Sequence, residues 1–403
     1  MTLVCQRQVQ GPAAHALVIG VGAYPQAKTP LAQPDTPKPL RNVADLPSAA
    51  TGADAFCDWL ISEAQLPVAL ATVEILKNGP NPAHGQYSWH GRLNSPGSTD
   101  PRGDIAVEEP TTPQVTAAGT RWINRLKSAA GNVGLLYICG HGAVLSSHPI
   151  VFLADLNGNA VQPWGAFLDV YDAAIGLKQI DQVAAAHLFV DACGELIPEI
   201  ELSNIGAGAK FVRSDPFKRG SEKVSLLAAA APNYLTYEDK PETGGRFTLT
   251  LLRALRGAAA RSLNNQARWF TYPHAIHEDL KCLYCLQAGW GGQPFEPAPP
   301  LLPSEASPIV VFGNPPEIIV QIRLDPQAAI NDGDLLVLDA GKTRPALYTR
   351  LKDGSFEWTL PMQASIWPHF LVAEFPPGGA HQNQELMFAP SRSLFNYTIK
   401  VSP

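Results

Sequence analysis

The strongest constraint on this fold is a series of short apolar runs that alternate along the chain with segments of helical spacing. The run from His15 to Gly22 is rich in β-branched residues, and Pro47 to Leu60 carries apolar residues at the spacing of a helix. The alternation continues with apolar runs at 72–76, 134–139, 187–192 and 224–230 and helical stretches at 116–129 and 247–257. Strands that are apolar on both faces need cover on both, so the pattern predicts an α/β fold with a mostly parallel sheet between helices.

The length and the later part of the chain indicate a second domain. At 403 residues the chain is longer than one hydrophobic core usually serves. The stretch 78–113 is polar, rich in Pro, Gly and Ser, and predicts a surface insertion. After Pro316 the pattern changes to alternating strands separated by turns such as Asp353-Gly354. We therefore expect an α/β domain over 1–315 and an all-β, sandwich-like domain over 316–403.

The composition excludes several classes of partner. Only 16% of the residues are charged, the net charge is −6, and no basic run is present to neutralise a phosphate backbone or an anionic membrane. No apolar run is long enough to span a bilayer, and the first residues do not resemble a secretion signal. Six cysteines are too few for a disulfide framework in a chain of this length. We expect a cytoplasmic protein with reduced thiols and with neither nucleic-acid nor membrane partners.

Two of the predicted strands carry a reactive side chain just beyond their carboxyl ends, where open α/β sheets usually build their sites. One apolar run leads into Cys139-Gly140-His141-Gly142, and the other leads into Asp191-Ala192-Cys193. A thiol near its ordinary pKa is only a few per cent thiolate at neutral pH, so a nucleophilic cysteine needs a neighbouring imidazole. This pattern favours Cys193 as nucleophile and His141 as its acid/base partner. Taken alone, it equally fits a buried strand-end cysteine and an unrelated loop histidine.

The ordered motifs of the chain resemble the caspase and metacaspase superfamily, and bacterial caspase-like peptidases in particular. The resemblance spans roughly residues 14 to 312 through motifs at 16–24, 46–47, 110–112, 139–142, 191–193 and 244–248. The two reactive residues are 52 positions apart (141 to 193), close to the caspase spacing of about 50. The resemblance implies a cysteine endopeptidase with a His141 and Cys193 dyad, a protein or peptide substrate and no cofactor. Its oxyanion hole would consist of the backbone N–H groups of Gly142 and Cys193.

The resemblance also suggests which residues bind the substrate side chain at P1. Asp191 stands two positions before the nucleophile, where metacaspases of basic specificity carry Asp, and Glu238 and Asp239 follow the strand at 224–230. Carboxylates attract a guanidinium or ammonium group, so we expect Arg or Lys at P1. An alternative role for Asp191 is a structural carboxylate that accepts hydrogen bonds from nearby backbone N–H groups. Metacaspases commonly carry Asn-Asp-Ala where this chain has Thr51-Gly52-Ala53, which leaves part of the S1 pocket and any calcium dependence open.

Other candidate sites are weaker, and we expect no metal site. His274, His277, Cys282 and Cys285 lie on one predicted helix whose 11-residue span is about 16 Å, too long for four ligands of one zinc ion. We expect His148 in a loop and Glu108 and Glu109 on a solvated surface.

The leading hypothesis is an endopeptidase that cuts after Arg or Lys and whose β domain contacts a partner protein. A catalytically degenerate caspase-like interaction module and acyl transfer by the same dyad are the alternatives. Self-processing, as in many family members, would fall in the basic connection 194–223. Lys218 and Arg219 are the preferred positions, because the run 209–213 alternates like a strand. An exposed basic turn that is never cut fits the same residues.

Overall fold

The computed structural model describes residues 2–28, 43–88, 104–145, 148–159, 162–197, 208–215, 217–235, 238–240, 243–262, 267–287, 295–301, 307–342, 346–350 and 357–402. Its contacts divide the chain into two compact units, each described here by itself. The first comprises Met1–Leu252 and Leu283–Ile309, and the second comprises Arg253–Cys282 and Val310–Pro403. The sequence pattern suggests only one boundary between the two units, near residue 315. The inclusion of Arg253–Cys282 in the second unit is visible only in the structure.

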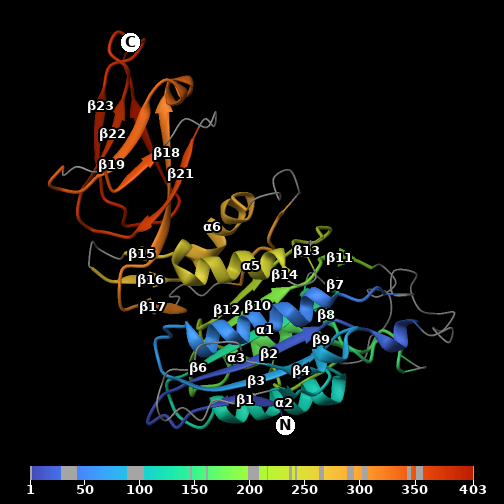
Figure 1. Cartoon of the computed structure of the whole chain (residues 1–403). Coiled ribbons are helices and arrows are strands. Elements are labelled where there is room, and N and C mark those ends of the chain that lie inside the picture. The colour runs from blue at the N-terminus through green and yellow to red at the C-terminus, as the bar shows by residue number, and fades with distance from the viewer. Residues whose placement is uncertain are drawn as a thin grey trace. The chain divides into compact units, whose positions relative to one another are not determined.

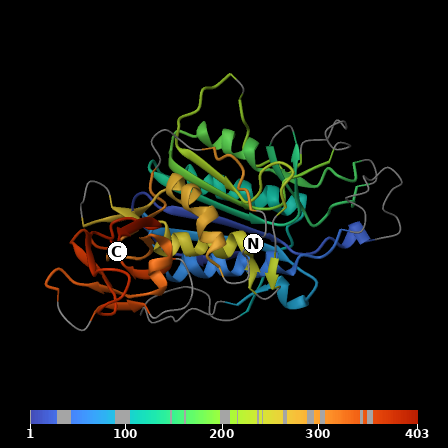
Figure 2. The same ribbon diagram turned by 90° about the horizontal axis from the view of Figure 1, so that it is seen from above.

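A six-stranded, mostly parallel sheet forms the centre of the first unit (Figures 1 and 2). Its order is β1-β3-β2-β6-β10-β12, and only β1, at the edge, is antiparallel to its neighbour. The strands are β1 (Leu3–Gln6), β2 (Ala14–Val21), β3 (Leu70–Asn78), β6 (Asn132–Cys139), β10 (Val183–Asp191) and β12 (Val224–Ala228). Every residue of β2, β3, β6 and β12 is buried, which confirms a sheet covered on both faces.

Helices cover the two faces of this sheet, and alternate residues of β6 show which helix lies on which face. The ring of Phe56 in α1 (Pro47–Ser62) stacks on Tyr137 with ring centroids 4.7 Å apart, and Thr248 of α5 (Arg246–Arg253) bonds the same tyrosine. Gly134 instead faces Trp122 and Leu126 of α2 (Thr112–Leu126), and α3 (Val170–Lys178) contributes to that same core. Odd and even positions of a strand point to opposite faces, so α1 and α5 lie opposite α2 and α3.

A smaller sheet extends the chain beyond the carboxyl ends of β6 and β10. Its order is β11-β7-β8-β9, with β7 (Gly142–Leu145), β8 (His148–Phe152), β9 (Phe167–Asp169) and β11 (Glu195–Leu196). The sequence pattern does not predict these strands, because runs of two to five residues are too short to show a period. The expectation that His148 lies in a loop is wrong, since it begins β8.

The predicted insertion 78–113 contains ordered elements in its described parts. A 3-10 turn at Pro82–Gly85 leads into β4 (Gln86–Tyr87), which pairs with β5 (Ile105–Ala106) and buries Tyr87 completely. Residues 89–103 lie outside the described part of the chain. Glu108, expected on a solvated surface, is half-buried and pairs with Arg121 at 3.8 Å. Of the run 209–213, predicted to alternate like a strand, only Ala209 forms a β bridge, to Leu168.

The second unit is built mainly from antiparallel strands. Two of its sheets have the orders β21-β18-β24 and β20-β19-β22-β23, and a third pairs β15, β16 and β17. The strands are β15 (Arg261–Ser262), β16 (Trp269–Thr271), β17 (Val310–Phe312), β18 (Glu317–Asp325), β19 (Asp334–Leu338), β20 (Tyr348–Arg350), β21 (Trp358–Gln363), β22 (His369–Glu374), β23 (Gln384–Phe388) and β24 (Phe395–Lys400). The helix α6 covers Pro273–Cys285, as the spacing predicts. Among the helices that the structure describes, none has the length and apolarity needed to cross a membrane.

Candidate active site

The strand register places His141 and Cys193 side by side. Cys139 is opposite Asp191 in the last pair of β6 and β10, and Ala143 is opposite Glu195 where β7 and β11 begin to pair. His141 and Cys193 lie midway between these two pairs, two residues beyond the first and two before the second. Parallel strands end at the same edge, so both side chains emerge at the carboxyl edge of the sheet.

Glycines allow the two loops to approach each other and their surroundings. A Cβ atom on Gly142 would lie 2.7 Å from the Cβ of Ala192 and 2.7 Å from the carbonyl oxygen of Ile150. A Cβ atom on Gly194 would lie 2.2 Å from the carbonyl oxygen of Ala231. All three distances are shorter than any ordinary contact, so residues with side chains at these two positions would push the loops away from their neighbours.

Backbone and aromatic groups orient His141. Its backbone N–H donates to the Tyr24 hydroxyl at 2.8 Å, and the two rings lie 5.3 Å apart. Its Nε2 atom lies 3.0 Å from the carbonyl oxygen of Ala44. A carbonyl oxygen can only accept, so Nε2 carries the proton and Nδ1 is the ring nitrogen that can accept one. Burial raises the pKa of Tyr24 far above its ordinary value, which keeps the phenol neutral.

The loop that follows β12 holds the segment of Cys193. The N–H of Gly194 donates to the carbonyl of Tyr234 at 2.9 Å, and the N–H of Asn233 donates to the carbonyl of Gly194 at 2.7 Å. These bonds hold the backbone of Asn233 and Tyr234 against the cysteine loop, and the side chains of Tyr234 and Leu235 are half-exposed. Cys193 itself is partly exposed, which a nucleophile requires, whereas Cys139 at the end of β6 is buried.

Asp191 lies in a buried polar network just before the nucleophile. Its carboxylate oxygen Oδ2 accepts hydrogen bonds from the Thr248 hydroxyl at 2.6 Å and from the Thr248 N–H at 3.3 Å. The Tyr137 hydroxyl lies 2.5 Å from Thr248 Oγ1. A threonine hydroxyl has one hydrogen and this one goes to Asp191, so Tyr137 donates to Thr248. The bond from the Thr248 N–H is of the kind expected if Asp191 is a structural carboxylate that accepts hydrogen bonds from backbone N–H groups.

Of the other predicted S1 residues, Glu238 is paired with a glycine whose backbone lies over Asp191. Glu238 begins β13 (Glu238–Lys240) and is opposite Gly245 of β14 (Gly244–Gly245). A Cβ atom on Gly245 would lie 2.4 Å from Asp191 Oδ2, so this glycine lets the backbone pass directly over the carboxylate. The side chains of Glu238 and Asp239 lie outside what the structure describes.

Sequence reasoning did not identify the roles of Tyr24, Ala44 and Thr248. Tyr24 and Thr248 fall inside the family motifs, but nothing in the motifs indicates their partners. A metal ion bound by protein side chains usually needs three or more converging His, Cys, Asp or Glu residues, and the part of the chain that the structure describes contains no such group. The helix α6 spreads His274, His277, Cys282 and Cys285 along its length.

Comparisons with known proteins give distant similarities. No protein-family model matches the chain. An uncharacterised protein of Sinorhizobium fredii is 26% identical over 159 residues, which is 38% of this chain and 44% of that protein, so the match spans less than half of the relative.

Similar solved structures include two caspases. Caspase-1 of Spodoptera frugiperda aligns over 75% of this chain and 96% of its own, at 10% identity and a TM-score of 0.42. The Drosophila initiator caspase Dronc aligns over 75% and 91%, at 10% identity and a TM-score of 0.36. A protein of Geobacter sulfurreducens aligns over 71% and 94%, at 14% identity and a TM-score of 0.37. Two of these three proteins are caspases, the superfamily that the sequence motifs resemble.

Proposed function

We propose that the protein is a cysteine endopeptidase in which Cys193 is the nucleophile and His141 its acid/base partner. The observation that supports this proposal is the register of β6, β10, β7 and β11, because the loops that carry the two residues lie between the same two strand pairings at the carboxyl edge of the sheet. The hydrogen bond from His141 Nε2 to the Ala44 carbonyl supports it, because it leaves Nδ1 as the proton acceptor.

The mechanism follows from these groups. His141 Nδ1 takes the thiol proton of Cys193, and the thiolate attacks the carbonyl carbon of the scissile peptide bond. The backbone N–H groups of Gly142 and Cys193 stabilise the negative charge that develops on the carbonyl oxygen. His141 then gives its proton to the leaving amine, and a thioester to Cys193 forms. His141 next removes a proton from water, and the resulting attack releases the acid and regenerates the thiol.

We further propose that the enzyme prefers Arg or Lys at P1, with Asp191 as the counter-charge at the base of the S1 pocket. Thr248 fixes the position of this carboxylate, and the pairing of Glu238 with Gly245 brings a second acidic residue to the same strand edge. A buried, immobilised carboxylate interacts with a guanidinium group more strongly than a solvated one does. Tyr234 and Leu235 supply apolar surface for neighbouring substrate residues.

We also propose that the region 316–403 is a sandwich-like accessory domain that contacts a partner protein. We propose further that the protein acts in the cytoplasm, where its thiols stay reduced. The sheets β21-β18-β24 and β20-β19-β22-β23 support this assignment. A catalytically degenerate interaction module with the same fold is the competing function.

A positional-scanning peptide library tests the proposal. The library is incubated with the wild type, with Cys193→Ala and with Cys282→Ala, a matched control because Cys282 is also partly exposed but lies on α6. We expect the wild type and Cys282→Ala to cleave after Arg and Lys, and Cys193→Ala to be inert. Cleavage that survives in Cys193→Ala overturns the dyad. Absence of cleavage, together with absence of labelling by a thiol-directed peptide inhibitor, favours the interaction module.

A further inference from the structure

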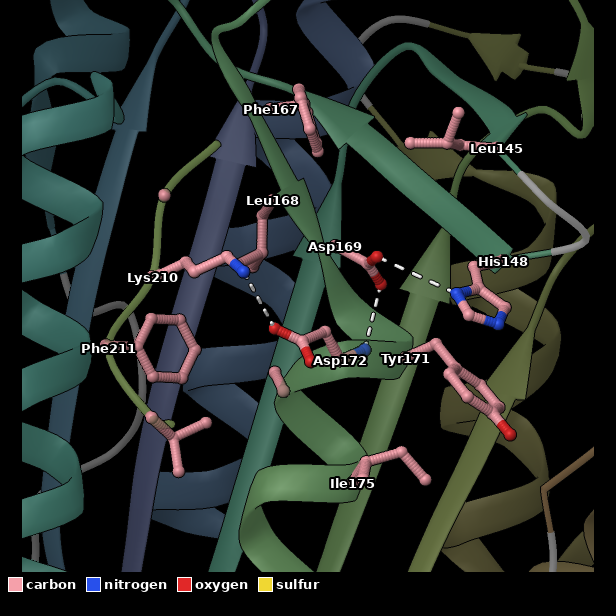
Figure 3. Close-up of a pocket in the computed structure, with 13 residues that line it drawn as sticks. Leu145, His148, Phe167, Leu168, Asp169, Tyr171, Asp172, Ile175, Lys210 and Phe211 are labelled. Carbon is pink, nitrogen blue, oxygen red and sulfur yellow. Dashed lines mark hydrogen bonds and ion pairs between the residues drawn. The ribbon is translucent and has the colours of Figure 1, made fainter. Parts of the chain in front are cut away.

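A cavity of about 400 Å³ lies in the first unit, apart from His141 and Cys193 (Figure 3). Its walls come from the end of β7, the start of β8, β9, the first turns of α3 and residues 209–212. Strands β7 and β8 connect it with the active site: Gly142, next to His141, is opposite Val151, and Leu145, at the cavity, is opposite His148. Ligand pockets in proteins usually enclose about 300 to 1,000 Å³, so this cavity is of the size that holds a small molecule.

The lining of the cavity is mainly apolar and includes a flat aromatic wall. Its apolar residues include Leu145, Phe167, Leu168, Ile175, Phe211 and Val212. The ring of Tyr171 stacks on the imidazole of His148, with centroids 4.0 Å apart and planes at 22° (Figure 3). Such a surface accepts an alkyl chain by hydrophobic contact and a cation over the face of the tyrosine ring.

Two carboxylates face the same space. Asp169 caps α3 by accepting the N–H of Asp172 at 2.9 Å, and its Oδ2 lies 3.8 Å from His148 Nδ1. Asp172 lies 3.5 Å from the ammonium group of Lys210 and accepts a hydrogen bond from the Ser214 hydroxyl at 2.6 Å. Among the residues that line the cavity, the two carboxylates of Asp169 and Asp172 outnumber the one ammonium group of Lys210. Burial raises the pKa of Asp169, so a further positive charge would stabilise its ionised form.

The ion pair between Lys210 and Asp172 shows that this carboxylate can bind an ammonium group. The Lys210 side chain is 57% exposed. Its segment meets β9 through the bridge between Ala209 and Leu168 and does not form a longer strand there. A half-exposed lysine on such a segment forms a weak ion pair, which a competing cation can displace.

We propose that this cavity binds an organic cation, an ammonium or guanidinium group on an apolar chain. The charged group takes the place of Lys210 at Asp172, and the chain lies along the wall of Tyr171 and His148. Charge-assisted hydrogen bonds supply the preference for the cation, and contact with the apolar lining supplies the preference for the chain.

Calorimetric titration of the Cys193→Ala protein tests this site without any dependence on peptidase activity. The probes are agmatine and hexylamine, with 1-hexanol as the neutral analogue of the amine. We expect both cations to bind at least tenfold more tightly than the alcohol and Asp172→Asn to weaken both at least tenfold. Lys210→Met is expected to strengthen binding severalfold, because it removes the internal competitor. Lys218→Met, another half-exposed lysine in an ion pair, is the matched control and leaves binding unchanged.

Agmatine also resembles the P1 side chain of the proposed substrate, so its binding to the S1 pocket must be separated from binding here. The variant Asp191→Ala retains the Asp172-dependent binding if the cavity is the site. Binding that Asp191→Ala removes and Asp172→Asn preserves belongs to the S1 pocket and overturns the proposal. No binding of the cations up to millimolar concentrations, equal binding of 1-hexanol, or no gain in Lys210→Met also overturns it. Melting temperatures of all variants verify that each is folded.

Discussion

The interior and the carboxyl edge of the central sheet carry histidines in opposite environments. Within the strands, His15, the second residue of β2, and His187, the middle residue of β10, flank β6, and both are buried, at 7% and 2% exposure. Each bonds a neighbouring hydroxyl: His15 Nδ1 lies 2.9 Å from Thr72 Oγ1, and His187 Nδ1 lies 2.8 Å from Ser225 Oγ. At the carboxyl end, His141 lies beyond the strand and bonds a backbone carbonyl.

This difference shows that the position along the strand, more than the residue type, decides what an imidazole can do. Burial lowers the pKa of His15 and of His187 to about 4, so both stay neutral near neutral pH and serve as polar members of the core. His141 is outside that core, and the bond of its Nε2 to the Ala44 carbonyl assigns the proton to Nε2. We expect the histidines within the strands to control stability and the histidine beyond the carboxyl end to control activity.

The largest expected effect separates the interior of the sheet from its carboxyl edge. His141→Ala should lower peptide turnover by about a thousandfold or more, because the thiolate then loses its base, with little change in melting temperature. His187→Ala should lower the melting temperature and leave the turnover of the folded fraction unchanged. Turnover is measured with active-site titration, so that only folded enzyme is counted. A His187→Ala variant that folds normally but does not turn over substrate would contradict the comparison.

The pH dependence of stability gives the next effect. The folded pKa values of about 4 lie below the ordinary 6.5, so the stability that these histidines contribute is fully present above pH 6.5. It is lost as the pH falls from 6.5 towards 4, by up to about 3 kcal/mol for each imidazole. Urea unfolding at pH 7 and pH 5 measures this loss. His187→Gln, which cannot be protonated, should lose less stability between the two pH values than the wild type, and an equal loss would refute the assignment.

Tyr24 offers a smaller effect at the carboxyl end. Tyr24→Phe removes the acceptor of the His141 N–H and should lower kcat about tenfold with KM unchanged, because the imidazole loses part of its orientation. Tyr87→Phe is the matched control, since it removes a buried hydroxyl that donates to Asp58 at 2.7 Å. Both variants should lose some thermal stability. An equal drop in kcat for the two variants would show that Tyr24 has no special role.

Self-processing has the smallest expected effect and sharpens the comparison further. Lys218 lies near the amino end of the sheet: its Nζ donates to the carbonyl of Gln179, the residue that follows α3, and β12 begins shortly after it. Cys193 is at the carboxyl end, so a cut after Lys218 or Arg219 requires a second molecule. Intact-mass spectrometry should show two fragments at a rate that rises with protein concentration, and none in Cys193→Ala. Cleavage at a rate independent of concentration contradicts this geometry, and a single full-length mass during peptide turnover refutes self-processing.

The sequence by itself determined the central strands to within a few residues and set His141 and Cys193 beyond the carboxyl ends of two of them. It could do so because an apolar, β-branched run reports burial on both faces of a sheet, and the order of such runs with helices implies parallel strands. The reactive residues follow these runs directly, so their placement needs only local information.

Only the tertiary structure decided which groups surround those residues. Tyr24 and Ala44, which bond His141, are 117 and 97 positions away along the chain, and Thr248, which bonds Asp191, is 57 positions away. The short strands β7, β8, β9 and β11, and the cavity that three of them help to form, likewise carry no readable period. A sequence pattern reports which side of an element is buried, but a hydrogen bond depends on where two distant segments meet, and packing of the whole chain fixes that.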